Sequence, residues 1–276
     1  MAIVWGATFP LGKLVLVHLA PFRYLELRFA LAAALMAPLA WRDLPSIRGG
    51  RLRGAVLTGA VLFCAYALQT LGLRTTTASE AGLITGLNVV IVPVLAMLWL
   101  RRPTDLITAA GVFAAGSGLW LLAWQGERLR AGDLLVMGCA VALAVHIVLV
   151  GRLAPSLPAR GFATLQLGTV AVLGLAASTL EPRPGPLPPY VVGAIVFMAI
   201  AATLLAYLVQ TWAQRFTSPV RAGLLFAVEP VAAVAFGVLW LGDSLSARQA
   251  VGAVAILAGV AMGEVARRER REGAWT

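Results

Sequence analysis

The chain has 276 residues, of which 60% are hydrophobic and only 12% charged, and its formal net charge is +10. Soluble domains carry about 45–50% apolar and about 25% charged residues, so this composition indicates a protein that is solvated by lipid. The positive charge does not indicate a nucleic-acid partner. The basic residues are scattered through short gaps between apolar stretches and form no single patch of the size that nucleic acid needs.

Ten apolar stretches follow one another along the chain, and each approaches the roughly 20 residues that a helix needs to cross a bilayer. They run from 2–19, 22–41, 54–73, 78–100, 104–123, 131–151, 160–180, 190–212, 218–241 and 246–266. The gaps hold the charges and the turn residues, including a proline-rich segment at 181–189. The stretches are too long and too continuously apolar for a membrane barrel. The sequence therefore predicts an all-α integral membrane protein with ten transmembrane helices.

The distribution of basic residues predicts the orientation of these spans. Ten spans place both termini on one side, and that side carries 14 arginines: Arg42, Arg48, Arg51, Arg53, Arg101, Arg102, Arg152, Arg160, Arg215, Arg221, Arg267, Arg268, Arg270 and Arg271. The opposite side carries 6: Arg23, Arg74, Arg128, Arg130, Arg183 and Arg248. Basic residues are retained in the cytoplasm. We therefore expect a bacterial inner-membrane protein with both termini in the cytoplasm and a basic tail at 267–276 near anionic lipid.

An internal repeat links the two halves of the chain. A gapless shift of 141 residues places Tyr66 on Tyr207, Gln69-Thr70 on Gln210-Thr211, and Asn88 on Glu229. Apolar matches arise easily by chance, so the matched polar residues are the informative ones.

Each half holds five predicted spans, and five is an odd number, so the second half must enter the membrane upside down. We expect five-helix repeats at 1–123 and 131–266. Inverted repeats recur in secondary transporters, where the two halves rock about a site near the midplane. A duplicated bundle with a merely structural role is the alternative.

Short motifs in both halves carry a resemblance to a known family. They are Trp5-Gly6-Ala7-Thr8-Phe9-Pro10, Leu27-Arg28-Phe29, Thr76 to Gly82, Val92-Pro93, Gln210 to Gln214, Glu229-Pro230-Val231 and Leu241-Gly242-Asp243. In order and spacing the chain resembles the EamA-type transporters of the drug/metabolite transporter superfamily. The resemblance implies ten helices in two inverted five-helix repeats around a central cavity, and export of amino acids, related metabolites or drug-like molecules.

Glu229 is the most pointed candidate for a role in transport. It lies about eleven residues into a span of about 24, where an ionised carboxylate is costly, so it is expected to be protonated, paired or facing water. One reading makes it a proton-coupling group or a site for a substrate amine. The other makes it a brace for the helix break that Pro230 creates. Its repeat partner Asn88 is expected to approach the same axis.

Four further polar residues are candidates for the cavity wall. Gln69 and Gln210 fall late in their spans, with Tyr66 and Tyr207 three residues before each on the same helix face. Each pair could line the cavity from opposite repeats. Alternatively, the pairs hydrogen-bond between helices and hold the bundle together.

The first span and the sixth add the remaining cavity candidates. Trp5, Thr8 and Phe9 could form an aromatic wall with a polar notch, although Trp5 could equally anchor the chain at the membrane interface. His146 could titrate near neutrality or simply satisfy a neighbour.

Charged and helix-breaking residues within the spans are given more ordinary roles. Lys13, Glu26 and Arg28 are expected to extend to the interface, with a substrate carboxylate as an alternative partner for Lys13. Three prolines are hinge candidates because proline removes a helical hydrogen bond: Pro10, Pro93 and Pro230.

No cofactor, metal or catalytic set is expected from this sequence. The two cysteines and two histidines have no metal-site spacing, and no nucleotide-binding glycine-rich motif is present. The polar residues are isolated, which does not favour an enzyme. The sequence predicts a secondary transporter of small organic metabolites with lipid as its surroundings. A channel-like facilitator of the same fold is the main alternative, a membrane enzyme or structural protein is a weaker one, and a homodimer is left open.

Overall fold

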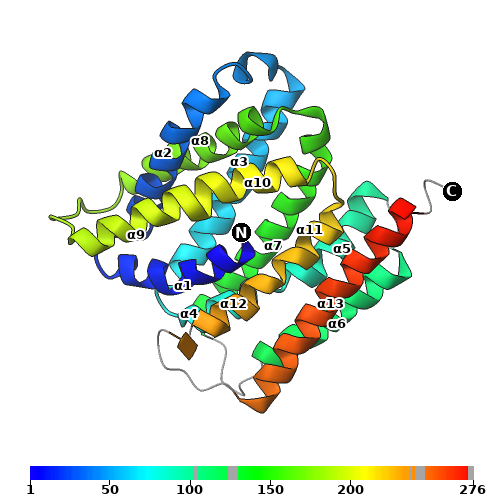
Figure 1. The fold of residues 1–276 in the computed structure, drawn as a ribbon. Coiled ribbons are helices and arrows are strands. Elements are labelled where there is room, and N and C mark those ends of the chain that lie inside the picture. The colour runs from blue at the N-terminus through cyan, green and yellow to red at the C-terminus, as the bar shows by residue number, and fades with distance from the viewer. Residues whose placement is uncertain (102–104, 124–129, 237, 240–245, 273–276) are drawn as a thin grey trace.

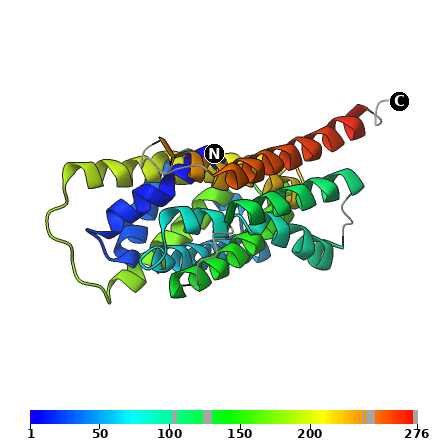
Figure 2. The same cartoon turned by 90° about the horizontal axis from the view of Figure 1, so that it is seen from below.

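The structure is a computed structural model that describes residues 1–101, 105–123, 130–236, 238–239 and 246–272. Helices make up its secondary structure throughout these ranges, with no strand among them. They lie as a layered bundle in which segments from both halves of the chain are interleaved (Figure 1). The same bundle seen from below shows α9 and α13 along one side (Figure 2).

The bounds of the elements follow the predicted apolar stretches closely. The first half contains α1 (Ala2–Leu16), α2 (Pro21–Ala40), η1 (Leu44–Ser46), α3 (Gly50–Gly72), α4 (Ala78–Thr85), α5 (Asn88–Leu100) and α6 (Leu106–Ala123). The second half contains α7 (Ala131–Leu153), η2 (Ala154–Ser156), α8 (Ala159–Ser178), α9 (Pro189–Ala199), η3 (Ile200–Leu205), α10 (Ala206–Ala213), α11 (Pro219–Phe226), α12 (Val228–Phe236) and α13 (Ala247–Glu272). The predicted basic tail therefore begins inside α13, and residues 273–276 lie outside the described ranges.

Seven helical segments among the described residues are long and apolar enough to cross a membrane. They are Gly50–Gly72, Ala78–Leu100, Ala131–Ser156, Ala159–Ser178, Pro189–Ala213, Pro219–Phe236 and Ala247–Val265. Two more apolar helices, Ala2–Leu16 and Leu106–Leu122, are shorter. α2 is long enough but carries Arg23, Glu26 and Arg28. Seven spans among the described residues meet both criteria, length and apolar composition, so the predicted count of ten stays a prediction.

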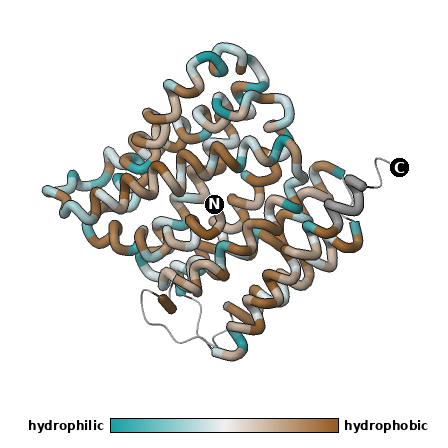
Figure 3. Tube along the Cα trace, viewed as in Figure 1, coloured by the Kyte–Doolittle hydropathy of each residue, from teal (hydrophilic) through white to brown (hydrophobic). Residues whose placement is uncertain are grey.

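The outer surface of the bundle is apolar. Large hydrophobic side chains stand exposed around it, among them Leu106, Phe113 and Val172. Hydrophobic residues run along most helices, whereas hydrophilic ones gather at helix ends and connections (Figure 3). A water-soluble monomer rarely exposes apolar surface on this scale. Apolar helices of this kind can span a bilayer, because their backbone N–H and C=O groups are hydrogen-bonded within the helix. The chain is a multi-pass membrane protein.

Two predicted spans are broken near their middles, at positions 141 residues apart. The 78–100 span consists of α4 and α5, and the 218–241 span contains α11 and α12. At the first break the N–H of Leu87 donates to the carbonyl of Ile84, and at the second the N–H of Ala227 donates to that of Leu224. These bonds to the third preceding residue tighten the last turn and end each half-helix. Asn88 and Glu229 therefore lie at the start of the second half-helix in each span.

Helices from opposite halves of the chain pack against each other. α2 lies along α8, α3 contacts α7 and α8, and α1 contacts α12. α6 and α13 form a separate pair at one corner of the molecule (Figure 1). The large core includes Phe29, Tyr66 and Tyr207, so it is centred between the two halves.

Glycines allow α6 and α13 to approach closely. A Cβ added at Gly118 would lie 2.5 Å from the carbonyl oxygen of Gly252 and 2.8 Å from the nitrogen of Ile256. A Cβ at Gly111 would lie 2.6 Å from the carbonyl oxygen of Gly259. Real side chains do not fit at such distances, so the two backbones approach closely at these glycines, as in many membrane helix pairs.

Replacing Gly118 with alanine is expected to destabilise the protein by about 1–3 kcal/mol, because the new methyl group must push two helix backbones apart. Unfolding of the purified protein in denaturing detergent measures the effect. Gly193→Ala is the matched control, since a Cβ at Gly193 meets nothing within 4 Å. Equal stability of both variants would contradict the close contact.

Candidate functional site

A small cavity lies inside the bundle, between helices of both halves. Its lining residues are Trp5, Thr8, Ala65, Tyr66, Gln69, Asn88, Cys139, Leu143, His146, Ile147, Tyr207, Gln210, Phe226 and Glu229. Its volume is about 30 Å³, which is room for about two water molecules. Nine of the ten residues predicted to form a cavity lie in this lining. The tenth, Phe9, packs beside it against Leu73, Ala81, Val136 and Ala233.

The lining is made largely of residues that the internal repeat relates. Four pairs stand 141 positions apart: Trp5 with His146, Tyr66 with Tyr207, Gln69 with Gln210, and Asn88 with Glu229. The first pair comes from α1 and α7, the next two from α3 and α10, and the last from the two helix breaks. The repeat thus places equivalent positions of each half around one cavity.

The two tyrosines meet at the centre of the cavity wall. The hydroxyl of Tyr207 donates to that of Tyr66 across 3.0 Å. The Tyr207 ring also contacts Trp5, with 5.6 Å between ring centroids, and His146, with 5.8 Å. Residues from α1, α3, α7 and α10 are joined by these contacts, so the cluster connects both halves.

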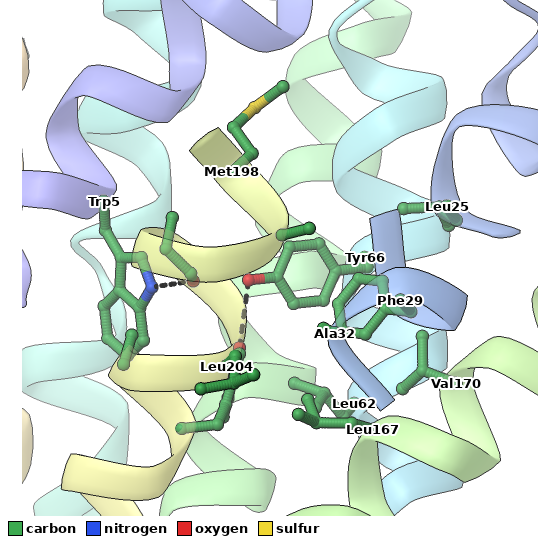
Figure 4. Close-up of a cluster of buried hydrophobic side chains, with 14 of the residues drawn as sticks. Trp5, Leu25, Phe29, Ala32, Leu62, Tyr66, Leu167, Val170, Met198 and Leu204 are labelled. Carbon is green, nitrogen blue, oxygen red and sulfur yellow. Dashed lines mark hydrogen bonds between the residues drawn. The ribbon is translucent and has the colours of Figure 1, made fainter. Parts of the chain in front are cut away.

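Trp5 is fixed by a helix irregularity in the second half. η3 is a π-helical segment, a local widening that changes which carbonyls are free to accept. The indole Nε1 of Trp5 donates to the carbonyl oxygen of Ala202 in this segment at 2.8 Å (Figure 4). Trp5 is buried and does not anchor the chain at the membrane interface.

Arg28 is fully buried, so the expectation that it extends to the interface was wrong. Its Nε donates to Thr203 at 2.7 Å and its Nη1 to the Tyr24 hydroxyl at 2.9 Å. Its Nη2 reaches the Tyr66 hydroxyl and the Ala202 carbonyl, both at 3.4 Å. The guanidinium also lies over the Tyr66 ring, 4.9 Å from its centroid. The guanidinium presents five N–H donors in a planar fork, and this geometry suits the set of acceptors around it. The hydrogen bonds therefore stabilise the positive charge of Arg28 inside the bundle.

Lys13 and Glu26 also have partners inside the protein. The Lys13 ammonium donates to the backbone carbonyl of Thr76. Glu26 forms a 2.6 Å ion pair with Arg23 and accepts from the Ser178 hydroxyl, also at 2.6 Å. Neither residue lines the cavity.

Glu229 stands in the first turn of α12, directly after the helix break, and its side chain reaches the cavity. A negative charge is favoured there by the helix dipole. Among the described residues its carboxyl has no hydrogen-bond or ion-pair partner, so within them it does not brace the break. Pro230 follows in the same turn. Backbone N–H groups in the first turn have no partner within their helix, so the N–H that proline lacks costs no helical hydrogen bond there.

Two glutamines that the sequence analysis did not single out hold lining residues in place. Gln214 accepts from Gln210 at 3.0 Å and donates to the carbonyl of Ile147 at 2.9 Å. Gln166 contacts His146 Nε2 at 2.7 Å and donates to the carbonyl of Phe162 at 3.3 Å. Gln69 is partly buried and adds its amide to the lining. Neither Gln166 nor Gln214 has a polar partner at the repeat position, and Gln214 appeared in the sequence only as the end of the Gln210 to Gln214 motif.

Comparisons with known proteins agree with this architecture. The model of the EamA-like transporter family matches residues 1–124 and again 130–263. An uncharacterized transporter of Archaeoglobus fulgidus is 28% identical over 260 residues, which cover 94% of this chain and 82% of the relative. The uncharacterized transporter YyaM of Bacillus subtilis is 28% identical over 277 residues, which cover 94% and 89%.

A solved crystal structure shares the fold. It superposes with a TM-score of 0.80 at 22% identity and covers 97% of this chain and 95% of its own. At that identity the likeness concerns the fold alone. The family resemblance inferred from the motifs is confirmed by the family model.

Replacing Arg28 with lysine is expected to lower stability by about 2 kcal/mol, because one ammonium cannot serve acceptors on α2, α3 and η3 at once. Thermal or detergent unfolding of the purified protein measures the loss. Arg42→Lys, in the exposed turn that follows the same helix, is the control and is expected to change little. Similar small effects of both variants would show that the guanidinium fork is dispensable.

Proposed function

The chain belongs to the EamA-like transporter family, and from this premise we propose that it is a secondary transporter that exports small organic metabolites across the bacterial inner membrane. Amino acids and related compounds are the solutes that the family resemblance favours. The observation that carries the proposal is the cavity between the two halves, lined by four polar or aromatic pairs from equivalent positions. No reaction chemistry is needed to account for these residues.

We further propose that residues 1–123 and 131–266 are two inverted five-helix repeats. The hydrogen bond between Tyr66 and Tyr207 supports this, because a residue can meet its own repeat equivalent only near the symmetry axis. The glycine contacts support it as well. Gly111 meets Gly259, the equivalent of Gly118, and Gly118 meets Gly252, the equivalent of Gly111. The double match of the family model is a third, independent support.

Transport would proceed by alternating access. A cavity of about 30 Å³ holds water but not a metabolite, so the helices around it must separate before a solute enters. The matched breaks at Gly86 and Ala227 divide two of these helices near the cavity. Broken helices with their ends at a central site are a recurring design of secondary transporters.

The three prolines are proposed hinges with different positions. Pro10 and Pro93 lie in the interiors of α1 and α5, where each removes a helical hydrogen bond. Pro230 lies beside the break before α12. All three helices contribute lining residues, so bending at these sites would open or close the cavity.

Glu229 is the proposed coupling residue. Its carboxyl borders the cavity, lies in the first turn of a half-helix and has no partner among the described residues. A carboxyl in such a place can gain and lose a proton as the cavity changes between wet and dry. Asn88 supplies the neutral equivalent from the other half.

A channel-like facilitator would use the same fold and would need a continuous water path. The small cavity favours alternating access instead. Purified protein in proteoliposomes, offered a panel of amino acids and metabolites with and without a pH gradient, separates the two functions. A transporter gives saturable flux that the gradient accelerates, whereas a facilitator gives flux that only follows the solute gradient. Flux equal to that of empty liposomes for the whole panel would contradict both.

Glu229→Gln keeps the side-chain shape and removes the titrating group. We expect at least a tenfold loss of gradient-driven flux, and the remaining flux should no longer vary between about pH 5 and 8. The measurement is solute flux in proteoliposomes. Glu264→Gln on α13, outside the cavity lining, is the control and should retain the pH dependence. Unchanged flux in Glu229→Gln across that range would exclude proton coupling through this residue.

Both termini are proposed to face the cytoplasm, on the basis of the 14 to 6 division of arginines. Reporter fusions after Thr276 should be active only when the reporter works in the cytoplasm. Activity of a reporter that works only in the periplasm would reject this topology.

A further inference from the structure

The cavity wall presents hydrogen-bond acceptors whose orientation is set from outside the cavity. One chain of bonds begins at the backbone carbonyl of Ile147, which can only accept. It therefore takes the Nε2 donor of Gln214, and the Gln214 Oε1 is left to accept from Gln210 Nε2. The last atom of the chain, Gln210 Oε1, is buried in the lining with no partner.

A second chain has the same direction. The carbonyl of Phe162 takes the Nε2 donor of Gln166 at 3.3 Å, so the Gln166 Oε1 faces His146. At 2.7 Å from that oxygen, the His146 Nε2 must carry the proton. In the neutral imidazole the Nδ1 of His146 is then the acceptor, and the ring lies in the lining.

Several donors in the lining are used within the protein. The indole of Trp5 donates to Ala202, the Thr8 hydroxyl to the carbonyl of Trp5, and the Tyr207 hydroxyl to Tyr66. One of the two N–H donors of Gln210 Nε2 is taken by Gln214. Tyr66 and the amides of Gln69 and Asn88 keep donors.

Acceptors in the lining are also left without donors. Asn88 Oδ1 is a second buried oxygen with no partner, and the Glu229 carboxyl adds a third acceptor group. A buried acceptor that lacks a donor costs about 1–3 kcal/mol, so the cavity is suited to a ligand that brings donors.

We propose that this cavity binds the primary ammonium group of its substrate, and that Gln214 and Gln166 are positioning residues that fix Gln210 and His146 as acceptors. The proposal rests on the transport function above and names the group that the site reads. An ammonium brings three N–H donors and one positive charge, which match Gln210 Oε1, Asn88 Oδ1, His146 Nδ1 and the Glu229 carboxylate. The Arg28 guanidinium does not line the cavity, and its donors are taken by Thr203, Tyr24, Tyr66 and Ala202.

The test uses methylammonium and its dimethyl, trimethyl and tetramethyl homologues, which keep one positive charge while losing donors one at a time. A ligand that binds the native state raises the unfolding midpoint of the purified full chain in detergent. We expect methylammonium to raise the midpoint most and tetramethylammonium to leave it unchanged. The dissociation constants should differ by about tenfold or more. All measurements are made at equal ionic strength.

The homologues also grow in size, and two variants separate donor number from size. Gln214→Met and Gln166→Met preserve side-chain length and break the bond chains, and neither residue lines the cavity. A preference that rests on donors should weaken in both, whereas a steric preference would persist. Gln249→Met on α13 is the matched control and should keep the wild-type order.

Three results would overturn the proposal. They are equal midpoint shifts for all four ions, no shift with methylammonium, and an unchanged order in both variants. If neither variant folds, the wild-type series still decides the first two. Flux of other solutes in proteoliposomes without any ammonium-dependent shift would overturn this inference and leave the transport function standing. A midpoint shift that depends on donor number, without flux of any solute, would support the ammonium site and contradict the transport function.

Discussion

The constraint on which this structure depends is that polar side chains buried in an apolar bundle must find partners inside the protein. Lipid offers no hydrogen bonds, and a partly satisfied network is costly. Arg28 shows the constraint most clearly, because its guanidinium is served by two tyrosines, a threonine and a backbone carbonyl on three different helices. The same network contains the Tyr66–Tyr207 bond, so the interaction that solvates the buried cation also joins the two halves.

Departures from regular helix geometry lie beside this network. The π-helical segment η3 presents the carbonyl that holds Trp5, and the two matched breaks place Asn88 and Glu229 at the cavity. The pair α6 and α13 lies at one corner of the molecule and is packed through glycines. Close packing at one corner and broken helices at the centre suit the proposed alternating access, in which the central helices bend.

The polarity of the cavity follows from atoms that no substrate touches. Helix carbonyls such as those of Ile147 and Phe162 can only accept hydrogen bonds. They fix the amide orientations of Gln214 and Gln166, whose oxygens then face the residues of the cavity wall. In this arrangement ordinary backbone carbonyls fix the orientation of the acceptors, and no additional charged group is needed. In the proposed ammonium site, residues outside the lining would therefore govern what the lining binds.

The sequence by itself determined the apolar helices, the 141-residue repeat, the family and nine of the residues that line the cavity. These are properties of composition and periodicity, and a repeated polar residue in an apolar span has few places to go. Only the tertiary structure decided the fate of Arg28, because a residue so near the start of a span can either reach the interface or turn inward. It also decided the roles of Gln166 and Gln214 and the exclusion of Phe9 from the lining. Each depends on which atoms of distant helices meet, and no local pattern carries that information.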